Sequence, residues 1–160
     1  MSFCRKSSAD IITAAVNALE KFATVTARSR LYQSPAWPDP TDPPFVNAVA
    51  RLETSLGPDA LLASLHAVEA GFGRRRSQKN APRTLDLDIL DYDGLRLTPS
   101  GASSLILPHP AIAERDFVLA PLAEVAPDWR HPISGETACE LLGGLKSRTA
   151  RPLAEKAGEC

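Results

Sequence analysis

The sequence is poor in the features that mark secreted, membrane-spanning or zinc-binding proteins. It has only three cysteines, Cys4, Cys139 and Cys160, which are widely scattered and show no metal-ligand spacing. An odd, unpatterned set of this kind fits a reducing compartment and argues against a zinc site. No apolar run approaches the ~20 residues that span a bilayer, and the first residues lack the apolar core of a signal peptide. We therefore expect a cytoplasmic protein that has no membrane partner.

The chain also lacks a strong net charge, which is −1 at pH 7. This balance predicts no bulk attraction to nucleic acid. Charge is nevertheless unevenly distributed, because the stretch 73–83 has five basic residues and no acidic one: Arg74, Arg75, Arg76, Lys79 and Arg83. Taken alone, this arginine cluster is typical of an exposed basic loop or a weak nucleic-acid patch.

The hydrophobic pattern predicts an α+β domain in which helices pack on a mainly antiparallel sheet. The 160 residues, 44% of them apolar, suffice for a single domain, residues 1–160, with one core. Apolar residues at helical spacing, together with capping residues, predict three helices, which begin at Ser8, at Gly57-Pro58 and at Thr137. Alternating or short apolar runs predict strands at 24–32, 45–54, 84–92, 95–97 and 117–120. We expect residues 1–8 to be atypical and residues 146–160 to form a frayed tail.

Two aspartates, Asp86 and Asp88, interrupt the otherwise apolar run from Leu85 to Ile89. Because the faces of a strand alternate with period two, both carboxylates are expected on one face. Two like charges this close repel each other unless a cation lies between them. A solvated strand face is the simpler explanation. The nearby arginine cluster favours another, in which the two carboxylates hold Mg²⁺ while arginines bind a polyphosphate.

Glu69 lies within the apolar stripe of the predicted second helix, where a carboxylate is unfavourable without a partner. Two partners are open at this point. Glu69 could pair with an arginine of the cluster, or it could accept hydrogen bonds from a ligand.

Phe45 and Asn47 share one face of their predicted strand, which also carries Arg51 and is therefore not simply the core face. An aromatic ring beside an amide, with Phe117 as a second ring, could stack on a flat heterocycle and hydrogen-bond its edge. Each residue by itself is better explained as part of the core or as a structural residue.

Together these residues resemble the 6-hydroxymethyl-7,8-dihydropterin pyrophosphokinase family of folate biosynthesis. The similarity runs from about Ala9 to Trp129, and the stretch 81–89, Ala-Pro-Arg-Thr-Leu-Asp-Leu-Asp-Ile, is close to the family's signature. Supporting blocks are 32–35, 45–48, 107–109 and 115–117. The resemblance implies a ferredoxin-like α+β sandwich. It also implies transfer of the β,γ-pyrophosphate of ATP to the pterin hydroxymethyl group, with release of AMP.

The resemblance further implies a role for each matching residue. Asp86 and Asp88 match the ligands of two Mg²⁺ ions and, with Arg74 and Arg83, form the expected catalytic set. The implied ATP contacts are Glu69, Arg74, Arg76, Arg83, Ile89, His109 and Arg115. The implied pterin contacts are Ser34, Pro35, Trp37, Phe45, Asn47 and Phe117, among which two aromatic rings sandwich the heterocycle.

The start of the chain departs from the family pattern. Family members open with a strand that ends in a Gly-Ser-Asn-Leu-like turn, whereas residues 1–8 contain no such strand and no glycine. We therefore expect the usual first strand to be missing or altered. This leaves an alternative to the active enzyme, a catalytically impaired descendant that binds nucleotide or pterin. A third class, a ferredoxin-like module that binds nucleic acid, is disfavoured by the net charge of −1. The enzyme is expected to be a monomer.

Overall fold

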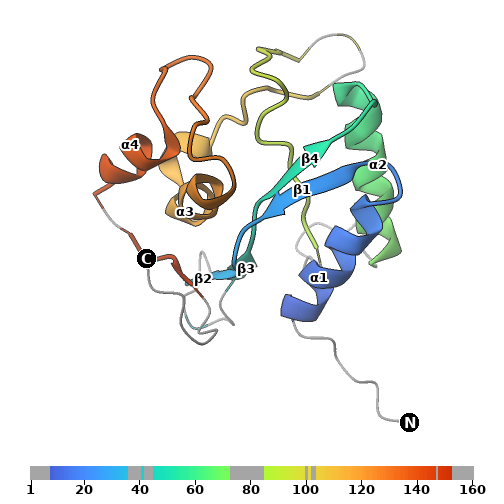
Figure 1. Cartoon of the computed structure of the whole chain (residues 1–160), viewed down its shortest axis with the longest axis horizontal. Helices are drawn as coiled ribbons and strands as arrows, with labels where there is room; N and C mark the ends of the chain where they lie inside the picture. The colour runs from blue at the N-terminus through green and yellow to red at the C-terminus, as the bar shows by residue number, and fades with distance from the viewer. Residues whose placement is uncertain are drawn as a thin grey trace. The chain divides into compact units, whose positions relative to one another are not determined.

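In the computed structural model of the chain, the described residues are 8–35, 41, 45–72, 85–99, 101, 104–146 and 148–152. Their helices and strands are, in chain order (Figure 1), α1 (Ser8–Leu19), β1 (Thr24–Arg28), β2 (Tyr32–Ser34), β3 (Phe45–Asn47), β4 (Ala50–Glu53), α2 (Pro58–Gly71), the 3-10 helix η1 (Ile112–Glu114), α3 (Asp116–Val125), α4 (Ala138–Gly143) and β5 (Arg151–Pro152). Helices and antiparallel strand pairs are both present, which confirms the predicted α+β class. No helix among these residues is long and apolar enough to cross a membrane.

The chain divides into two compact units. Unit 1 consists of Met1–Val25 and Leu52–His109, and unit 2 consists of Thr26–Arg51 and Pro110–Cys160. Each unit therefore combines two stretches that are far apart in the sequence. The prediction of one domain over residues 1–160 stays a prediction. The expected change in the first strand concerns residues 1–8, of which 1–7 lie outside the described residues.

The core of unit 1 is built by α1 and α2, which lie side by side in Figure 1 and pack against each other. Leu61 and Leu65, one helical turn apart on α2, are both buried, as is Leu19 at the end of α1. Pro58 stands at the start of α2, where its preset φ suits a helix and its missing N–H has no intrahelical acceptor to lose. Both helices confirm the predictions made from apolar spacing.

The strands predicted at 24–32 and 45–54 are each broken into two. The breaks meet at Ser29 and Val49: the Ser29 N–H donates to the Val49 carbonyl at 2.9 Å, and the Val49 N–H donates to Ser29 Oγ at 2.9 Å. Because a side-chain hydroxyl replaces a main-chain acceptor here, the regular ladder is interrupted. β1 then pairs with β4, and β2 pairs with β3. Arg51 belongs to β4, so the prediction that it shares a strand face with Phe45 and Asn47 was wrong.

The strand predicted at 84–92 is also wrong for the part that is described, since residues 85–91 belong to no strand. Their main-chain groups bond elsewhere. The Leu87 N–H donates to the Glu69 side chain at 3.4 Å, and the Leu90 carbonyl accepts from the His109 N–H at 2.8 Å. A helix side chain and a neighbouring loop thus replace the partner strand that the pattern implied.

A tight turn follows at Asp93 and Gly94. Both residues have positive φ, 52° and 71°, the combination that a type I′ turn requires and that aspartate and glycine accept most readily. The chain beyond the turn forms a single antiparallel bridge between Leu97 and Leu107 rather than the strand expected at 95–97.

In unit 2, the strand predicted at 117–120 is part of helix α3, so that prediction was wrong. Leu119, Leu122 and Val125 are buried at intervals of three residues, which is the spacing of one helix face. A run of four apolar residues is too short to separate a buried helix from a buried strand, and the longer repeat decides it. The helix predicted from Thr137 is confirmed: Thr137 caps α4, with its Oγ1 accepting from the Glu140 N–H at 3.2 Å.

The small sheet of unit 2 has the order β3-β2-β5, with both pairs antiparallel. β5 lies within the tail that was expected to be frayed, residues 146–160. Gln33 is paired with Arg151 and Tyr32 with Pro152, so this part of the tail is held by β2. Residues 153–160 lie outside the described part of the chain.

Candidate functional site

Four of the predicted site residues, Trp37, Arg74, Arg76 and Arg83, lie outside the described residues, and their roles remain predictions. The others fall into two groups, one in each unit. Unit 1 contains Glu69, Asp86, Asp88, Ile89 and His109, and unit 2 contains Ser34, Pro35, Phe45, Asn47, Arg115 and Phe117.

Asp86 and Asp88 are both exposed, whereas Leu85 and Ile89 on either side of them are buried. The period-two alternation expected from the sequence is therefore present, although the segment is not a ladder strand. Ile89 packs in the core of unit 1. Only its main chain could therefore contact a nucleotide, while the two carboxylates are open to solvent.

The fold brings His109 beside Asp88. Its main-chain N–H donates to the Leu90 carbonyl at 2.8 Å, and its side-chain Nε2 lies 4.0 Å from Asp88 Oδ2. The His109 side chain is 23% exposed and that of Asp88 is 50% exposed, so both groups are reachable from solvent. The Asp88 carboxylate is suited to bind a cation, and the neighbouring His109 imidazole is suited to hydrogen-bond phosphate oxygens.

Glu69 is almost completely buried, at 1% exposure, on helix α2. Its Oε2 accepts from the Leu87 N–H at 3.4 Å. Leu87 stands between Asp86 and Asp88, so this bond ties the main chain that carries both carboxylates to the helix. The sequence had left two partners open for Glu69, an arginine or a ligand. The partner observed is of a third kind, the main-chain N–H of Leu87. The arginines of the cluster lie outside the described residues.

Glu69→Ala is expected to lower the free energy of unfolding by about 1–3 kcal/mol, because the Leu87 N–H loses the buried carboxylate that accepts its hydrogen bond. Glu69→Gln keeps an acceptor oxygen and should lose less. Urea unfolding measures both changes. The exposed Glu20 on the surface of the same unit is the control, and a Glu20→Ala loss as large as that of Glu69→Ala would contradict a specific role for the Glu69 carboxylate.

In unit 2, the register of β2 and β3 places Ser34 opposite Phe45 and Tyr32 opposite Asn47. Ser34 Oγ and Asn47 Nδ2 are buried, yet neither has a hydrogen-bond partner within the described part of the chain. Buried donors without partners are unfavourable unless a bound molecule satisfies them. Phe45, in contrast, is 47% exposed, which leaves an aromatic face available for stacking.

Arg115 and Phe117 flank the first residue of α3. The Arg115 guanidinium carbon lies 5.6 Å from the centre of the Phe117 ring, within range of a cation–π contact. Helix α3 packs against β2. The second aromatic ring of the predicted pterin pocket is therefore on an element that contacts the strand of Ser34.

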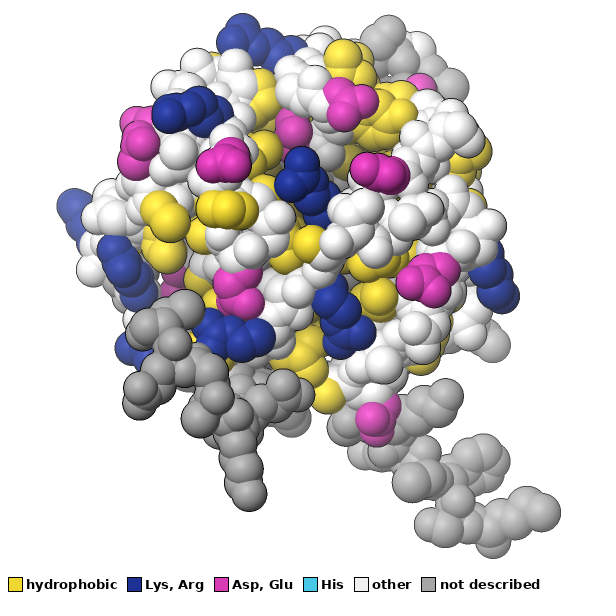
Figure 2. Space-filling model, in the orientation of Figure 1, with side chains coloured by type: hydrophobic (Ala, Val, Ile, Leu, Met, Phe, Trp, Pro, Cys, Tyr) yellow, Lys and Arg dark blue, Asp and Glu magenta, His cyan; other side chains and the backbone are white. Residues whose placement is uncertain are grey.

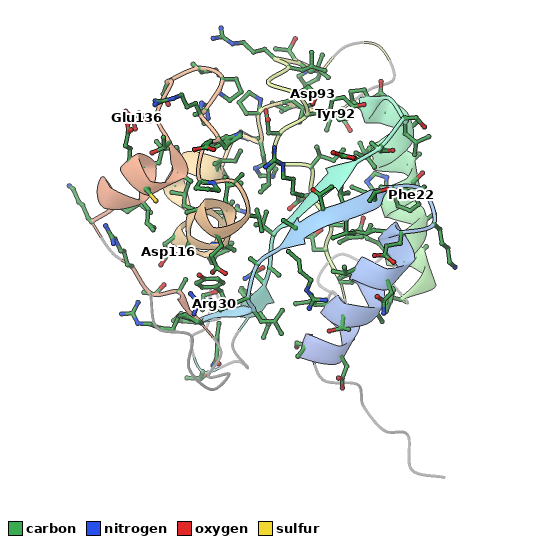
Figure 3. All side chains as sticks on the ribbon, in the orientation of Figure 1. Phe22, Arg30, Tyr92, Asp93, Asp116 and Glu136 are labelled. Carbon is green, nitrogen blue, oxygen red and sulfur yellow. The ribbon has the colours of Figure 1, made fainter. Side chains whose placement is uncertain are left out.

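Glu124 joins α3 to β2 and was not identified from the sequence. One of its carboxylate oxygens accepts from the Tyr32 hydroxyl, and the other accepts from the Arg30 N–H and Nε–H at 3.1 and 3.3 Å. Figure 3 shows Arg30 beside β2. A single glutamate in a helix has no sequence signal for such a role, because its partners lie far away along the chain.

No group of three or more metal-binding side chains gathers within the ranges that are described. A cation at Asp86 and Asp88 would accordingly need further oxygen ligands from substrate or water. On the face that Figure 2 shows, basic and acidic side chains are interspersed, and the described residues visible there form no continuous basic surface.

Comparison with known proteins gives one consistent result. The sequence model of the 7,8-dihydro-6-hydroxymethylpterin-pyrophosphokinase family matches residues 4–127, which is more than half of the chain. A 2-amino-4-hydroxy-6-hydroxymethyldihydropteridine pyrophosphokinase of Synechocystis is 42% identical over 126 residues, covering 79% of this chain and 63% of that protein.

Two further relatives are similar over comparable lengths. The enzyme of the same name from Methylorubrum extorquens is 42% identical over 121 residues, which cover 76% of this chain and 73% of the relative. The folic acid synthesis protein of Pneumocystis carinii is 40% identical over 142 residues, which cover 86% of this chain but 19% of that longer protein.

Proposed function

The chain belongs to the 7,8-dihydro-6-hydroxymethylpterin-pyrophosphokinase family, a family of folate-synthesis enzymes, and we propose that it catalyses the family reaction itself. In this reaction the β,γ-pyrophosphate of ATP is transferred to the hydroxymethyl group of 6-hydroxymethyl-7,8-dihydropterin, and AMP is released. The observation that carries the proposal is the exposed pair Asp86 and Asp88 beside His109.

Asp86 and Asp88 fit a magnesium site by the chemistry of their donors. Mg²⁺ keeps several waters and usually takes one or two protein carboxylates together with substrate phosphates. Two exposed carboxylates that are separated by one residue on the chain meet that requirement without a third ligand from the described residues. Bound there, Mg²⁺ supplies neutralisation of the charge on the phosphate oxygens. Two ions are expected for the whole reaction.

The phosphoryl chemistry needs little from the protein beyond positioning and charge. The pterin hydroxyl attacks the β-phosphorus in line with the departing AMP oxygen, so the P–O bond to AMP breaks as the new P–O bond forms, and the hydroxyl proton is released to water. Arg74 and Arg83 are proposed to stabilise the charge that develops, and Arg76, His109 and Arg115 to bind the nucleotide. Glu69 is proposed to act near the nucleotide, and Ile89 through its main chain.

The pterin is proposed to bind at β2, β3 and the start of α3. Ser34 Oγ and Asn47 Nδ2, which have no hydrogen-bond partner among the described residues, support this, since the edge of a pterin offers nitrogen and oxygen acceptors. Phe45 and Phe117 are proposed as the two stacking rings. Pro35 and Trp37 complete the proposed set, and we propose that the enzyme acts as a monomer in the cytoplasm.

The test is to incubate the purified chain with ATP, Mg²⁺ and the reduced pterin and to identify the nucleotide product. AMP formed only when the pterin is present is the expected result. The matched control is 6-methyl-7,8-dihydropterin, which has no hydroxyl to accept pyrophosphate and should give no AMP. Saturable binding of ATP without any product would indicate the impaired descendant, and salt-sensitive RNA binding alone would indicate the nucleic-acid module.

A further inference from the structure

Asp116 is a buried carboxylate, 8% exposed, at the first position of α3. Its Oδ2 accepts two main-chain hydrogen bonds from the C-terminal segment, one from the Thr149 N–H and one from the Ala150 N–H at 2.7 Å. Figure 3 shows Asp116 on the side of α3 toward this segment. Bonds from N–H groups to an ionised acceptor are roughly twice as strong as neutral ones. The tail is therefore joined to the helix by more than surface contact.

The same segment is held at a second point. Immediately after Ala150, Arg151 and Pro152 form β5 and pair with Gln33 and Tyr32 of β2. Residues 148–152, which we call the C-terminal strap, thus bond to the start of α3 and to β2. The family match ends at residue 127, so the strap lies outside the matched part of the chain.

Both points of attachment adjoin residues that the proposed function places in contact with substrate. Asp116 stands between Arg115 and Phe117, whose side chains contact each other at 5.6 Å. On β2, Ser34 directly follows Gln33. Any movement of the Asp116 main chain also moves both of its neighbours, because the three residues are consecutive at the point where the chain enters the helix.

We infer that Asp116 is a positioning residue, through which the C-terminal strap holds Arg115 and Phe117 in place for nucleotide and pterin. This inference rests on the proposed function for the identity of the ligands. It predicts that loosening the strap weakens substrate binding more than it slows the bound substrates' reaction, because the residues it positions are binding contacts.

The first experiment compares full-length Asp116→Asn with Asp128→Asn, which removes an exposed carboxylate of the same unit. For Asp116→Asn we expect KM for the pterin to rise about tenfold, with kcat changed by less than about threefold. Asp128→Asn should match the unmodified chain in both constants. Assays well below the melting temperature separate binding from folding. A lower melting temperature with an unchanged KM would overturn the inference.

The second experiment alters the strap and leaves Asp116 intact. Ala150→Pro removes the N–H that donates to Asp116, whereas Ala150→Ser at the same position keeps it. Ala150→Pro should raise the pterin KM as Asp116→Asn does, and Ala150→Ser should not. The double variant Asp116→Asn with Ala150→Pro should have a pterin KM little higher than that of either single variant, since both substitutions act on the same hydrogen bond. Fully additive effects would overturn the inference.

A third measurement needs no catalysis and distinguishes this inference from the proposed function. The Val118 and Leu119 N–H groups both donate to the Arg115 carbonyl, so their hydrogen exchange reports on the start of α3. Asp116→Asn and Ala150→Pro should speed their exchange at least about tenfold relative to the two control variants. If the unmodified chain makes no AMP, the proposed function fails. Unchanged exchange rates in Asp116→Asn and Ala150→Pro would overturn the inference that the strap holds the start of α3, whatever the activity.

Discussion

A chain carrying Asp88→Ala is expected to release AMP at least about a thousandfold more slowly than the unmodified chain, and Asp86→Ala to behave alike. Both carboxylates are exposed and only one residue apart on the chain, and we propose that they bind the cation that neutralises the phosphate oxygens. Without one carboxylate, that charge stays uncompensated as the P–O bond breaks. Pterin-dependent formation of AMP at saturating ATP and Mg²⁺ measures the effect.

Substitutions that keep the shape of the side chain sharpen this prediction. Asp86→Asn and Asp88→Asn should be nearly as inactive as the alanine variants, because the charge and not the volume matters. The matched control is Asp93→Asn, which alters an exposed carboxylate in the turn of the same unit, where asparagine also accepts the φ of 52°. The control should retain full activity. Near-normal Mg²⁺-dependent rates in either alanine variant would refute the magnesium role of the pair.

Asn47→Ala is expected to raise KM for the pterin about 10- to 100-fold while leaving the free energy of unfolding almost unchanged. The physical reason is that Asn47 Nδ2 is buried without a partner in the described part of the chain. A donor without a partner among the described residues adds no hydrogen bond there that would stabilise the fold, but its loss leaves an acceptor of the bound pterin unsatisfied. Steady-state kinetics and urea unfolding of the same preparation measure the two effects.

Two comparisons separate this role of Asn47 from a structural one. Asn47→Asp has nearly the same shape but replaces the donor by an acceptor, so it should bind the pterin at least as poorly as the alanine variant. The exposed Asn17 on α1 is the control, and Asn17→Ala should leave the pterin KM and the free energy of unfolding almost unchanged. A large loss of stability in Asn47→Ala with an unchanged pterin KM would assign Asn47 to the fold and remove it from the site.

Local patterns were sufficient wherever the physics is short-range. The apolar spacing and Pro58 predicted α2, and the hydroxyl of Thr137 predicted the start of α4. Each of these depends on groups a few residues apart. The same holds for the alternation of exposed aspartates with buried apolar residues between Leu85 and Ile89, which persists without a strand.

Predictions failed where the outcome depends on a partner that is distant in sequence. The segment 85–91 has the pattern of a strand, but its Leu87 N–H bonds to Glu69 and no strand pairs with it in the described chain. The long strands at 24–32 and 45–54 break because Ser29 meets Val49. A four-residue apolar run at 117–120 could not indicate that Leu122 and Val125 continue its buried face as a helix.

The same distinction between local patterns and distant partners applies to the candidate site. The sequence alone determined the residue types on which the proposed chemistry rests, because the types and spacing of Asp86, Asp88 and the arginine cluster predict a cation and a polyphosphate. Only the tertiary structure decided which groups support them: His109 beside Asp88, Glu69 on the main chain of Leu87, and Asp116 bound to the strap. Residue type is a property of the chain, whereas these contacts join segments whose approach depends on the packing of the whole unit.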